Sequence, residues 1–139
     1  MRKLAVACVA IALSLFLCAC SSAPDVEVSC GDFYKTQNIE RELQVAAGKS
    51  VKVALCSNPS TGYGWGEAAI SDPGVLAKVG HAYDAREGRK PPAPGTPGLE
   101  VWTLKALQPG QSTLSVEYGQ PWEGGTKAEW TFVLTVVVR

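Results

Sequence analysis

The chain has 139 residues, which is enough for one domain with a single hydrophobic core. Its 13 basic and 13 acidic residues give a formal net charge of zero and form no basic stripe, so nucleic acid is not expected as a partner. We therefore predict a single domain that works as a monomer.

Residues 1–19 have the pattern of an export signal. Two basic residues precede an almost entirely apolar run over residues 4–17, which is shorter than the roughly 20 residues of a membrane-spanning helix. The run ends in Leu17-Cys18-Ala19-Cys20, which resembles the bacterial lipoprotein processing box. The resemblance implies cleavage before Cys20, lipidation of Cys20 and an exported lipoprotein at the outer membrane. An ordinary signal peptide cut near Ala19 or Ala23 is the alternative.

Two of the five cysteines remain for the exported domain, because Cys8 and Cys18 leave with the signal and Cys20 takes the lipid. The remaining pair, Cys30 and Cys56, favours a disulfide in an exported chain, with two buried free thiols as the alternative. The chain has only one histidine to join them, so we expect no metal site.

Residues 20–28 are predicted to be a polar tether, after which short strands alternate with turns. Residues 39–45 and 51–55 alternate apolar and polar side chains on either side of a turn at Gly48, which predicts a hairpin. A further short strand is predicted at 75–79, followed by an ambiguous segment at 81–84. The chain then becomes rich in proline and glycine over residues 86–98, which indicates an exposed loop.

Three longer strands follow this loop, at residues 99–107, 112–118 and 128–139. The last of them is apolar on both faces, and we therefore place it centrally in its sheet. No segment of residues 29–139 carries a helical apolar stripe. Short strands separated by turn signals predict a single all-β domain, a β-sandwich over residues 29–139.

The stretch between residues 57 and 66 is the most locally specified part of the sequence. Pro59 restricts its own backbone and that of the preceding residue, and three glycines follow within seven positions. Tyr63 and Trp65 stand between these glycines and could anchor a contact or fold back into the core. The segment is therefore either a binding loop or a tight turn, with Trp65 assigned to the core and Tyr63 to loop support or contact.

Residues for catalysis do not form a recognisable set. With His81 as the only histidine, no Ser-His-Asp arrangement can be supported, and we place His81 at the surface or at a strand edge. Gly48-Lys49-Ser50 ends like a phosphate-binding loop, but Leu43 occupies the position of the required first glycine. We therefore predict a binding protein without catalytic residues, cofactor or metal.

Three motifs, in order, resemble those of the chagasin-like inhibitors of papain-type cysteine proteases. Asn58-Pro59-Ser60-Thr61-Gly62-Tyr63 followed by Trp65 resembles the family signature, which usually has threonine at the position of Ser60. Gly95-Thr96-Pro97-Gly98, leading into Glu100-Val101-Trp102-Thr103, is similar to the glycine-rich loop before the family's Val-Trp strand. Tyr118-Gly119-Gln120-Pro121-Trp122-Glu123 resembles the third loop, which normally contains Arg-Pro-Trp. The resemblance covers residues 29–139.

The resemblance implies an immunoglobulin-like sandwich with three loops, at 57–64, 91–98 and 119–125, gathered at one end. It implies reversible, non-covalent inhibition of papain-like cysteine proteases by loops that occlude the active-site cleft. An envelope-anchored binding or adhesion module for a non-protease partner is the alternative. The residues assigned to protease contact are Asn58, Pro59, Ser60, Thr61, Gly62, Tyr63, Gly95, Thr96, Pro97, Gly98, Gln120, Pro121 and Trp122.

Two of these positions depart from the family pattern. Gln120 stands where arginine is usual and therefore brings neither a charge nor a forked donor to the third loop. Pro97 stands where glycine is usual and removes a backbone donor from the second loop. Both departures affect the strength of inhibition or the choice of protease.

Overall fold

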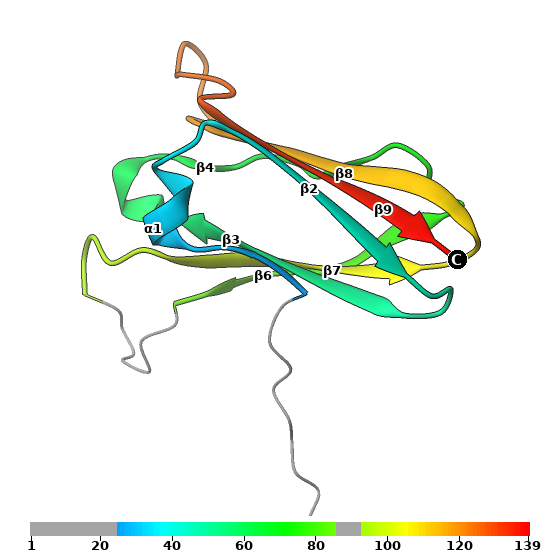
Figure 1. The fold of residues 1–139 in the computed structure, drawn as a ribbon. Helices are drawn as coiled ribbons and strands as arrows, with labels where there is room; N and C mark the ends of the chain where they lie inside the picture. Colours follow the sequence, from blue (N-terminus) through cyan, green and yellow to red (C-terminus); the bar gives the residue numbers. More distant parts are fainter. Residues whose placement is uncertain (1–24, 86–92) are drawn as a thin grey trace, which may run out of the picture.

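A computed structural model describes residues 25–85 and 93–139 of the chain (Figure 1). The predicted signal, the lipidation residue Cys20 and the start of the second loop at Pro91 and Pro92 lie outside the described residues. The described chain forms two β-sheets that face each other across one core, as predicted for a β-sandwich. Among these residues no helix is long and apolar enough to cross a membrane.

The first sheet contains four strands, in the spatial order β1-β3-β7-β6. Their bounds are Val26–Val28 for β1, Ser50–Ser57 for β3, Gly98–Ala106 for β7 and Leu76–Asp84 for β6. β1 pairs in parallel with β3, with Val26 opposite Val53. The folded domain therefore begins earlier than predicted, because the segment assigned to a tether over residues 20–28 ends in an edge strand.

The second sheet contains five strands, four of them in the order β2-β9-β8-β4, with β5 also paired to β8. Their bounds are Asn38–Val45 for β2, Trp130–Val138 for β9, Gly110–Gly119 for β8, Gly64–Trp65 for β4 and Ala69–Ile70 for β5. β9 lies between β2 and β8, which confirms its predicted central place.

The predicted hairpin between residues 39–45 and 51–55 is wrong. β2 pairs in parallel with β9 along its whole length, whereas β3 belongs to the other sheet. The turn at Gly48 is hydrogen-bonded across the gap between the sheets, from the Ala47 N–H to the Arg139 carbonyl at 3.0 Å and from the Gly48 N–H to the Ala106 carbonyl at 2.8 Å. Alternation of side chains defines two strands but does not define which strand each one pairs with.

β6 is one strand where the sequence predicted a short strand followed by an ambiguous segment. Its pairing with β7 shifts register between Lys78 and Gly80, which is the irregularity that interrupts the alternation of the sequence. His81 is exposed on β6, the edge strand of its sheet, as predicted. Its ring stacks on Trp102 of the neighbouring strand β7, with a centroid distance of 4.8 Å.

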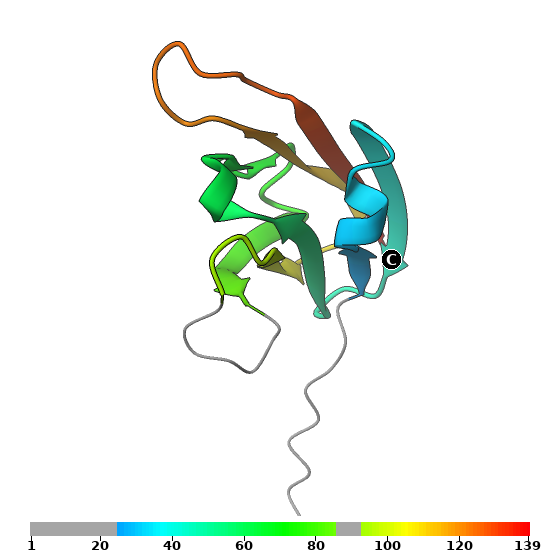
Figure 2. The same cartoon turned by 90° about the vertical axis from the view of Figure 1, so that its left-hand side faces the viewer.

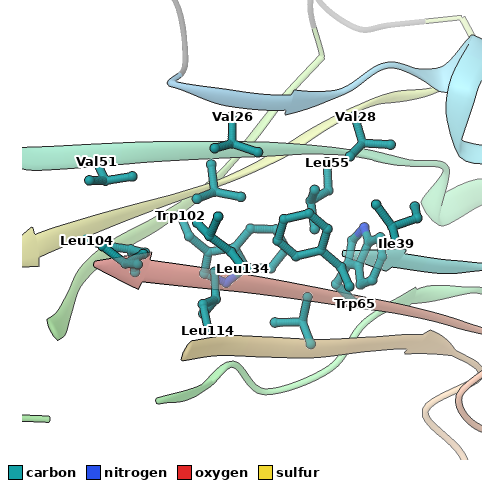
Figure 3. Packing of buried hydrophobic residues seen from close by; sticks show 14 of the residues in the cluster. Val26, Val28, Ile39, Val51, Leu55, Trp65, Trp102, Leu104, Leu114 and Leu134 are labelled. Carbon is teal, nitrogen blue, oxygen red and sulfur yellow. The ribbon is translucent and has the colours of Figure 1, made fainter. Parts of the chain in front are cut away.

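The core is filled by alternate side chains of the two sheets (Figure 3). Leu104 of β7 and Leu134 of β9 are fully buried, and Leu114, Val116 and Tyr118 of β8 are buried as well. Burial of each such side chain contributes about 1.5–3 kcal/mol, which is how a sandwich of short strands becomes stable. Trp65 is 8% exposed and belongs to this core, as predicted.

Two short helical turns lie at one end of the sandwich. α1 spans Cys30–Phe33 and is capped by Ser29, whose hydroxyl accepts a hydrogen bond from the Asp32 N–H. Phe33 enters the core and packs edge-on against Trp65, with ring centroids 5.7 Å apart. The second turn, η1, spans Pro59–Thr61 and follows β3 directly.

Candidate functional site

The three predicted loops lie together at one end of the sandwich (Figure 1). In the view onto this end the loops follow one another along one side: the third at the top, the first in the middle and the second below (Figure 2). The first loop (residues 57–64) connects β3 to β4, the described part of the second (93–98) leads into β7, and the third (119–125) leaves β8. We call these residues the loop end.

The first loop is a closed turn held by its own side chains. The Thr61 hydroxyl donates to the Asn58 carbonyl at 2.7 Å, and the Ser60 hydroxyl donates to Oδ1 of Asn58 at 2.6 Å. Gly62 then ends the turn in the left-handed region, with φ 81°, where residues with a Cβ are strained. Pro59, Ser60 and Thr61 are exposed at the tip, so the loop presents a rigid, compact surface.

Aromatic residues support this loop from below. The Tyr118 hydroxyl accepts a hydrogen bond from the Asn58 N–H at 3.0 Å, and the Trp65 indole N–H donates to the Cys56 carbonyl at 2.9 Å. Tyr63 stacks on Tyr118 with centroids 5.8 Å apart, which makes it a support of the loop. Burial raises the pKa of Tyr118 above its ordinary value, partly offset by the hydrogen bond from Asn58.

Asn58 joins the first loop to the second. Its side-chain amide donates to the Gly95 carbonyl at 3.1 Å, and Gly95 has a φ of 85°, which allows the second loop to turn there. At the base of this loop Gly98 is tightly enclosed, because a Cβ on it would lie 2.5 Å from the Asp84 carbonyl oxygen. The second loop is therefore held both by the first loop and by the neighbouring strand.

Glu100 connects the bases of the first two loops. The buried Ser57 hydroxyl donates to one carboxylate oxygen at 2.9 Å, and Nε2 of His81 lies 2.8 Å from the other. Glu100 is therefore in contact with Ser57 of β3 and with His81 of β6, the two strands on either side of β7. These contacts hold the three strands together at the base of the loops.

Trp122 joins the first loop to the third. A Cβ on Gly62 would lie 2.9 Å from Cη2 of Trp122, and a Cβ on Gly125 would lie 2.9 Å from its Nε1. The indole therefore lies against two glycines, one in each loop. It remains 49% exposed, which is unusual for a tryptophan and leaves a large apolar surface available at the loop end.

The predicted Gln120 is placed at the start of the third loop. Its side-chain oxygen accepts a hydrogen bond from the Thr126 N–H at 2.9 Å, so this side chain is engaged within the loop. Gln120 is predicted from the sequence to contact a partner, and the structure shows its side chain bonded within the loop. Tyr118, Glu100 and Lys127 support the loops and are not among the predicted residues. Tyr118 is buried on its strand, but no sequence pattern indicates that its hydroxyl reaches Asn58.

Cys30 and Cys56 form a disulfide, with an S–S distance of 2.05 Å and a Cα–Cα distance of 4.9 Å. The two cysteines therefore form the predicted disulfide and are not free thiols. It attaches α1 to β3 one residue before the first loop begins, and the Cys30 sulfur lies 3.7 Å from the Gly98 carbonyl oxygen. The base of the first loop is therefore linked covalently to the N-terminal segment, and the base of the second loop lies in contact with the same bridge.

The loop end offers contact surfaces and backbone groups. Within residues 25–85 and 93–139 no three His, Cys, Asp or Glu side chains gather closely enough to hold a metal ion. All thirteen residues predicted to contact a partner lie in these three loops. The hydrogen bond from Asn58 and the indole of Trp122 make the loops a single composite surface.

Comparison with known proteins identifies a matching family model and a relative. The family model for the chagasin family of peptidase inhibitors, I42, matches residues 44–136. Amoebiasin-2 of Entamoeba histolytica is 29% identical over 99 residues, which cover 70% of this chain and 76% of that protein.

Solved structures with a similar fold include a cysteine protease inhibitor. The crystal structure of the cysteine protease inhibitor EhICP2 from Entamoeba histolytica superposes with a TM-score of 0.59 at 23% identity, covering 84% of this chain and 100% of that one. The structure of Leishmania mexicana ICP gives a TM-score of 0.53 at 28% identity, covering 76% and 92% of the two chains. The fold is the immunoglobulin-like sandwich expected from the sequence.

Proposed function

The chain belongs to the chagasin family of peptidase inhibitors, and from this premise we propose that its loop end occludes the active-site cleft of papain-like cysteine proteases. Inhibition is reversible and involves no covalent step and no catalysis by this chain. The family match favours this function over an adhesion module. The observation that carries the mechanism is the linkage of all three loops, through Asn58 to Gly95 and through Gly62 to Trp122.

The first loop enters the cleft beside the catalytic cysteine. A protease cleaves a peptide bond that is presented in an extended conformation, whereas Pro59–Thr61 form a helical turn closed by Gly62. The exposed tip at Thr61 therefore fills the space without offering a bond in a cleavable geometry. The hydrogen bonds of Asn58 hold this turn before the protease arrives, which lowers the entropy lost on binding.

The other two loops lie on the two sides of the cleft. The segment from Gly95 to Gly98 contacts one wall mainly through its backbone because its side chains are small, with one backbone donor fewer at Pro97. The exposed indole of Trp122 packs on the other wall, where an aromatic anchor is the usual centre of binding energy. Gln120 supports the third loop from within, so the binding energy there comes from Trp122 and the backbone.

A lipid anchor places the inhibitor at the outer membrane. This part of the proposal is supported by the apolar run of residues 4–17 and the processing box that ends at Cys20. β1 runs parallel to β3, which ends at the first loop. The chain therefore runs through β1 toward the loop end, so an anchor attached before β1 is consistent with a loop end that faces away from the bilayer.

Substitution at the loop tip tests the proposed contact. Thr61→Arg adds a long charged side chain at an exposed position, so it should weaken inhibition of papain strongly, while the loss of the Thr61 hydroxyl bond to the Asn58 carbonyl lowers the free energy of unfolding by only about 1 kcal/mol. Thr113→Arg, on a partly exposed strand position of β8, is the control for an added arginine. Equal inhibition by the wild-type and Thr61→Arg proteins would place the protease contact elsewhere.

A further inference from the structure

We propose that Lys127 is a positioning residue for inhibition. Its ammonium group links the neck of the third loop, where Gln120 pairs with Thr126, to the backbone of Trp122 at the tip, and thereby holds the Trp122 indole against Gly62. The proposal rests on the proposed function, because its consequence for binding requires that Trp122 contacts the protease. The holding of Trp122 itself is a property of the free protein and is tested separately.

The ammonium group of Lys127 contacts two carbonyl oxygens of the third loop. Nζ donates to the Gln120 carbonyl at 2.6 Å and to the Trp122 carbonyl at 2.7 Å. These carbonyls belong to the residues on either side of Pro121, so the ammonium group bridges the backbone from Gln120 to Trp122. Hydrogen bonds from a charged donor are shorter and stronger than neutral ones. A lysine that binds two backbone carbonyls of one loop fixes the path of its backbone.

The remaining hydrogen bonds of the loop act at its neck and at its tip separately. Gln120 and Thr126 close the neck, through the Gln120 N–H to the Thr126 carbonyl at 2.7 Å and through the Thr126 N–H to Oε1 of Gln120 at 2.9 Å. The tip is closed by the Gly125 N–H, which donates to the Trp122 carbonyl at 3.2 Å. Lys127 binds one acceptor in each of these parts and connects them.

The backbone of this segment is shaped to bring Lys127 back across the loop. Gly124 has a φ of 77°, and Ala128, directly after the lysine, has a φ of 48°, the positive value that residues with a Cβ usually avoid. Such strain persists where the surrounding structure holds the residue in place. The turn at Ala128 lets β9 begin at Trp130 while the lysine side chain points into the concave side of the third loop.

The consequence for binding is electrostatic as well as conformational. Lys127 places a positive charge within hydrogen-bond distance of the Trp122 backbone, in a loop where Gln120 contributes none. Arginine carries the same charge and can also donate to two carbonyls, whereas methionine has a similar length without charge or donor. We call the two hydrogen bonds from Lys127 to the Gln120 and Trp122 carbonyls the clamp. Comparing arginine with methionine at this position therefore distinguishes the effect of the clamp from the effect of side-chain size.

The experiment compares Lys127→Met, Lys127→Arg and a matched control in protein beginning at Ser21, which contains every strand of the two sheets. The control is Lys105→Met, because Lys105 also donates to a backbone carbonyl, that of Gly48, at the opposite end of the sandwich. Inhibition constants are measured against papain. In parallel, 5-fluorotryptophan labelling gives one 19F signal per tryptophan, and the signal of Trp122 is assigned by its loss in Trp122→Phe.

We expect the inhibition constant of Lys127→Met to rise by about tenfold, because the loop must then be ordered on binding. Lys127→Arg and Lys105→Met should stay within about threefold of the wild-type value. The Trp122 19F signal of free Lys127→Met should narrow or shift, while the signals of the three other tryptophans stay in place.

An unchanged Trp122 signal in Lys127→Met would overturn the clamp, whatever happens to inhibition. A changed signal with an unchanged inhibition constant would overturn the role of the clamp in binding. Failure of the wild-type protein to inhibit papain and related enzymes would instead refute the proposed function, and the 19F comparison would still decide whether Lys127 holds Trp122.

Discussion

The indole of Trp122 lies so close to Gly62 that a Cβ on this glycine would stand 2.9 Å from Cη2 of the ring. The tip of the first loop and the anchor of the third are therefore in direct contact before any partner binds. Together with the hydrogen bond from Asn58 to Gly95, this contact makes three segments that are distant in sequence behave as one rigid surface. Rigid surfaces lose less entropy on binding, which is the physical basis of the inhibitor mechanism.

Gly62→Ala should disrupt this contact. The new methyl group must displace Trp122, and alanine is also strained at a φ of 81° by about 1 kcal/mol. Gly48→Ala is a matched control, because Gly48 has a φ of 84° but no atom within 4 Å of the Cβ position. Urea unfolding should show similar losses of stability for both variants, whereas only Gly62→Ala should inhibit papain poorly. Equal inhibition by the two variants would contradict a shared surface of the first and third loops.

Asn58→Asp should release the second loop from the first. The carboxylate can still accept the hydrogen bond from Ser60, but it cannot donate to the Gly95 carbonyl and would repel it. We expect weaker inhibition of papain and faster hydrogen exchange at the backbone amide of Thr96. Ser60→Ala is the control that removes only the bond within the first loop. If Ser60→Ala weakens inhibition as much as Asn58→Asp does, the link to Gly95 has no separate role.

Tyr118→Phe should destabilise the protein by about 1 kcal/mol, because the partly buried Asn58 N–H loses its acceptor. The ring itself is retained, so its stacking with Tyr63 is kept. Urea unfolding at neutral pH measures this difference. A Tyr118→Phe protein as stable as the wild type would mean that Asn58 finds another partner.

The same substitution makes a prediction about pH. The pKa of Tyr118 is raised in the folded protein, so the folded state keeps its proton where the unfolded state begins to lose it. The stabilising contribution is complete below the ordinary tyrosine pKa of about 10 and is lost as the pH rises from there through the higher folded pKa. The wild type should therefore lose stability more steeply than Tyr118→Phe in urea unfolding above about pH 10. Parallel curves for the two proteins would refute the raised pKa.

Removal of the disulfide by Cys30→Ser with Cys56→Ser should lower the free energy of unfolding by about 3 kcal/mol. The bridge joins cysteines that are 26 residues apart in the sequence, and Cys56 immediately precedes the first loop. Guanidinium unfolding of the double variant and of the wild type, before and after reduction, measures the contribution of the disulfide to the free energy of unfolding. Reduced wild type should match the double variant, and a loss below about 1 kcal/mol would show that packing around Phe33 suffices to hold the N-terminal segment.

Much of this architecture follows from local patterns. Alternation in residues 112–118 and the apolar character of both faces of the last strand were enough to predict β8 and the central place of β9. Proline and glycine spacing defined the first loop, because such residues restrict the backbone locally and act without distant partners. These features are encoded within a few residues, which is why the sequence alone reveals them.

The remaining features depend on which distant segments meet. The sequence suggested a hairpin at Gly48 because its two strands are adjacent along the chain, yet β2 finds its partner in β9, about ninety residues later. The strand Val26–Val28 has only three residues and adjoins the polar tether, so its sequence alone does not identify it as a strand. Its pairing with β3 does. The role of Tyr118 depends in the same way on a hydroxyl that reaches Asn58, 60 positions away, whereas the contacts of Lys127 are local but no sequence motif marks them.

The central claim is that the loop end inhibits papain-like cysteine proteases and that Trp122 is its anchor. The most direct measurement is a titration of active-site-counted papain with wild-type protein beginning at Ser21 and with Trp122→Ala. We predict reversible one-to-one inhibition by the wild type, with Trp122→Ala weaker by about 2 kcal/mol, or roughly thirtyfold, and nearly unchanged in stability. A wild-type protein that is folded but leaves papain and related enzymes fully active at micromolar concentration would contradict the claim.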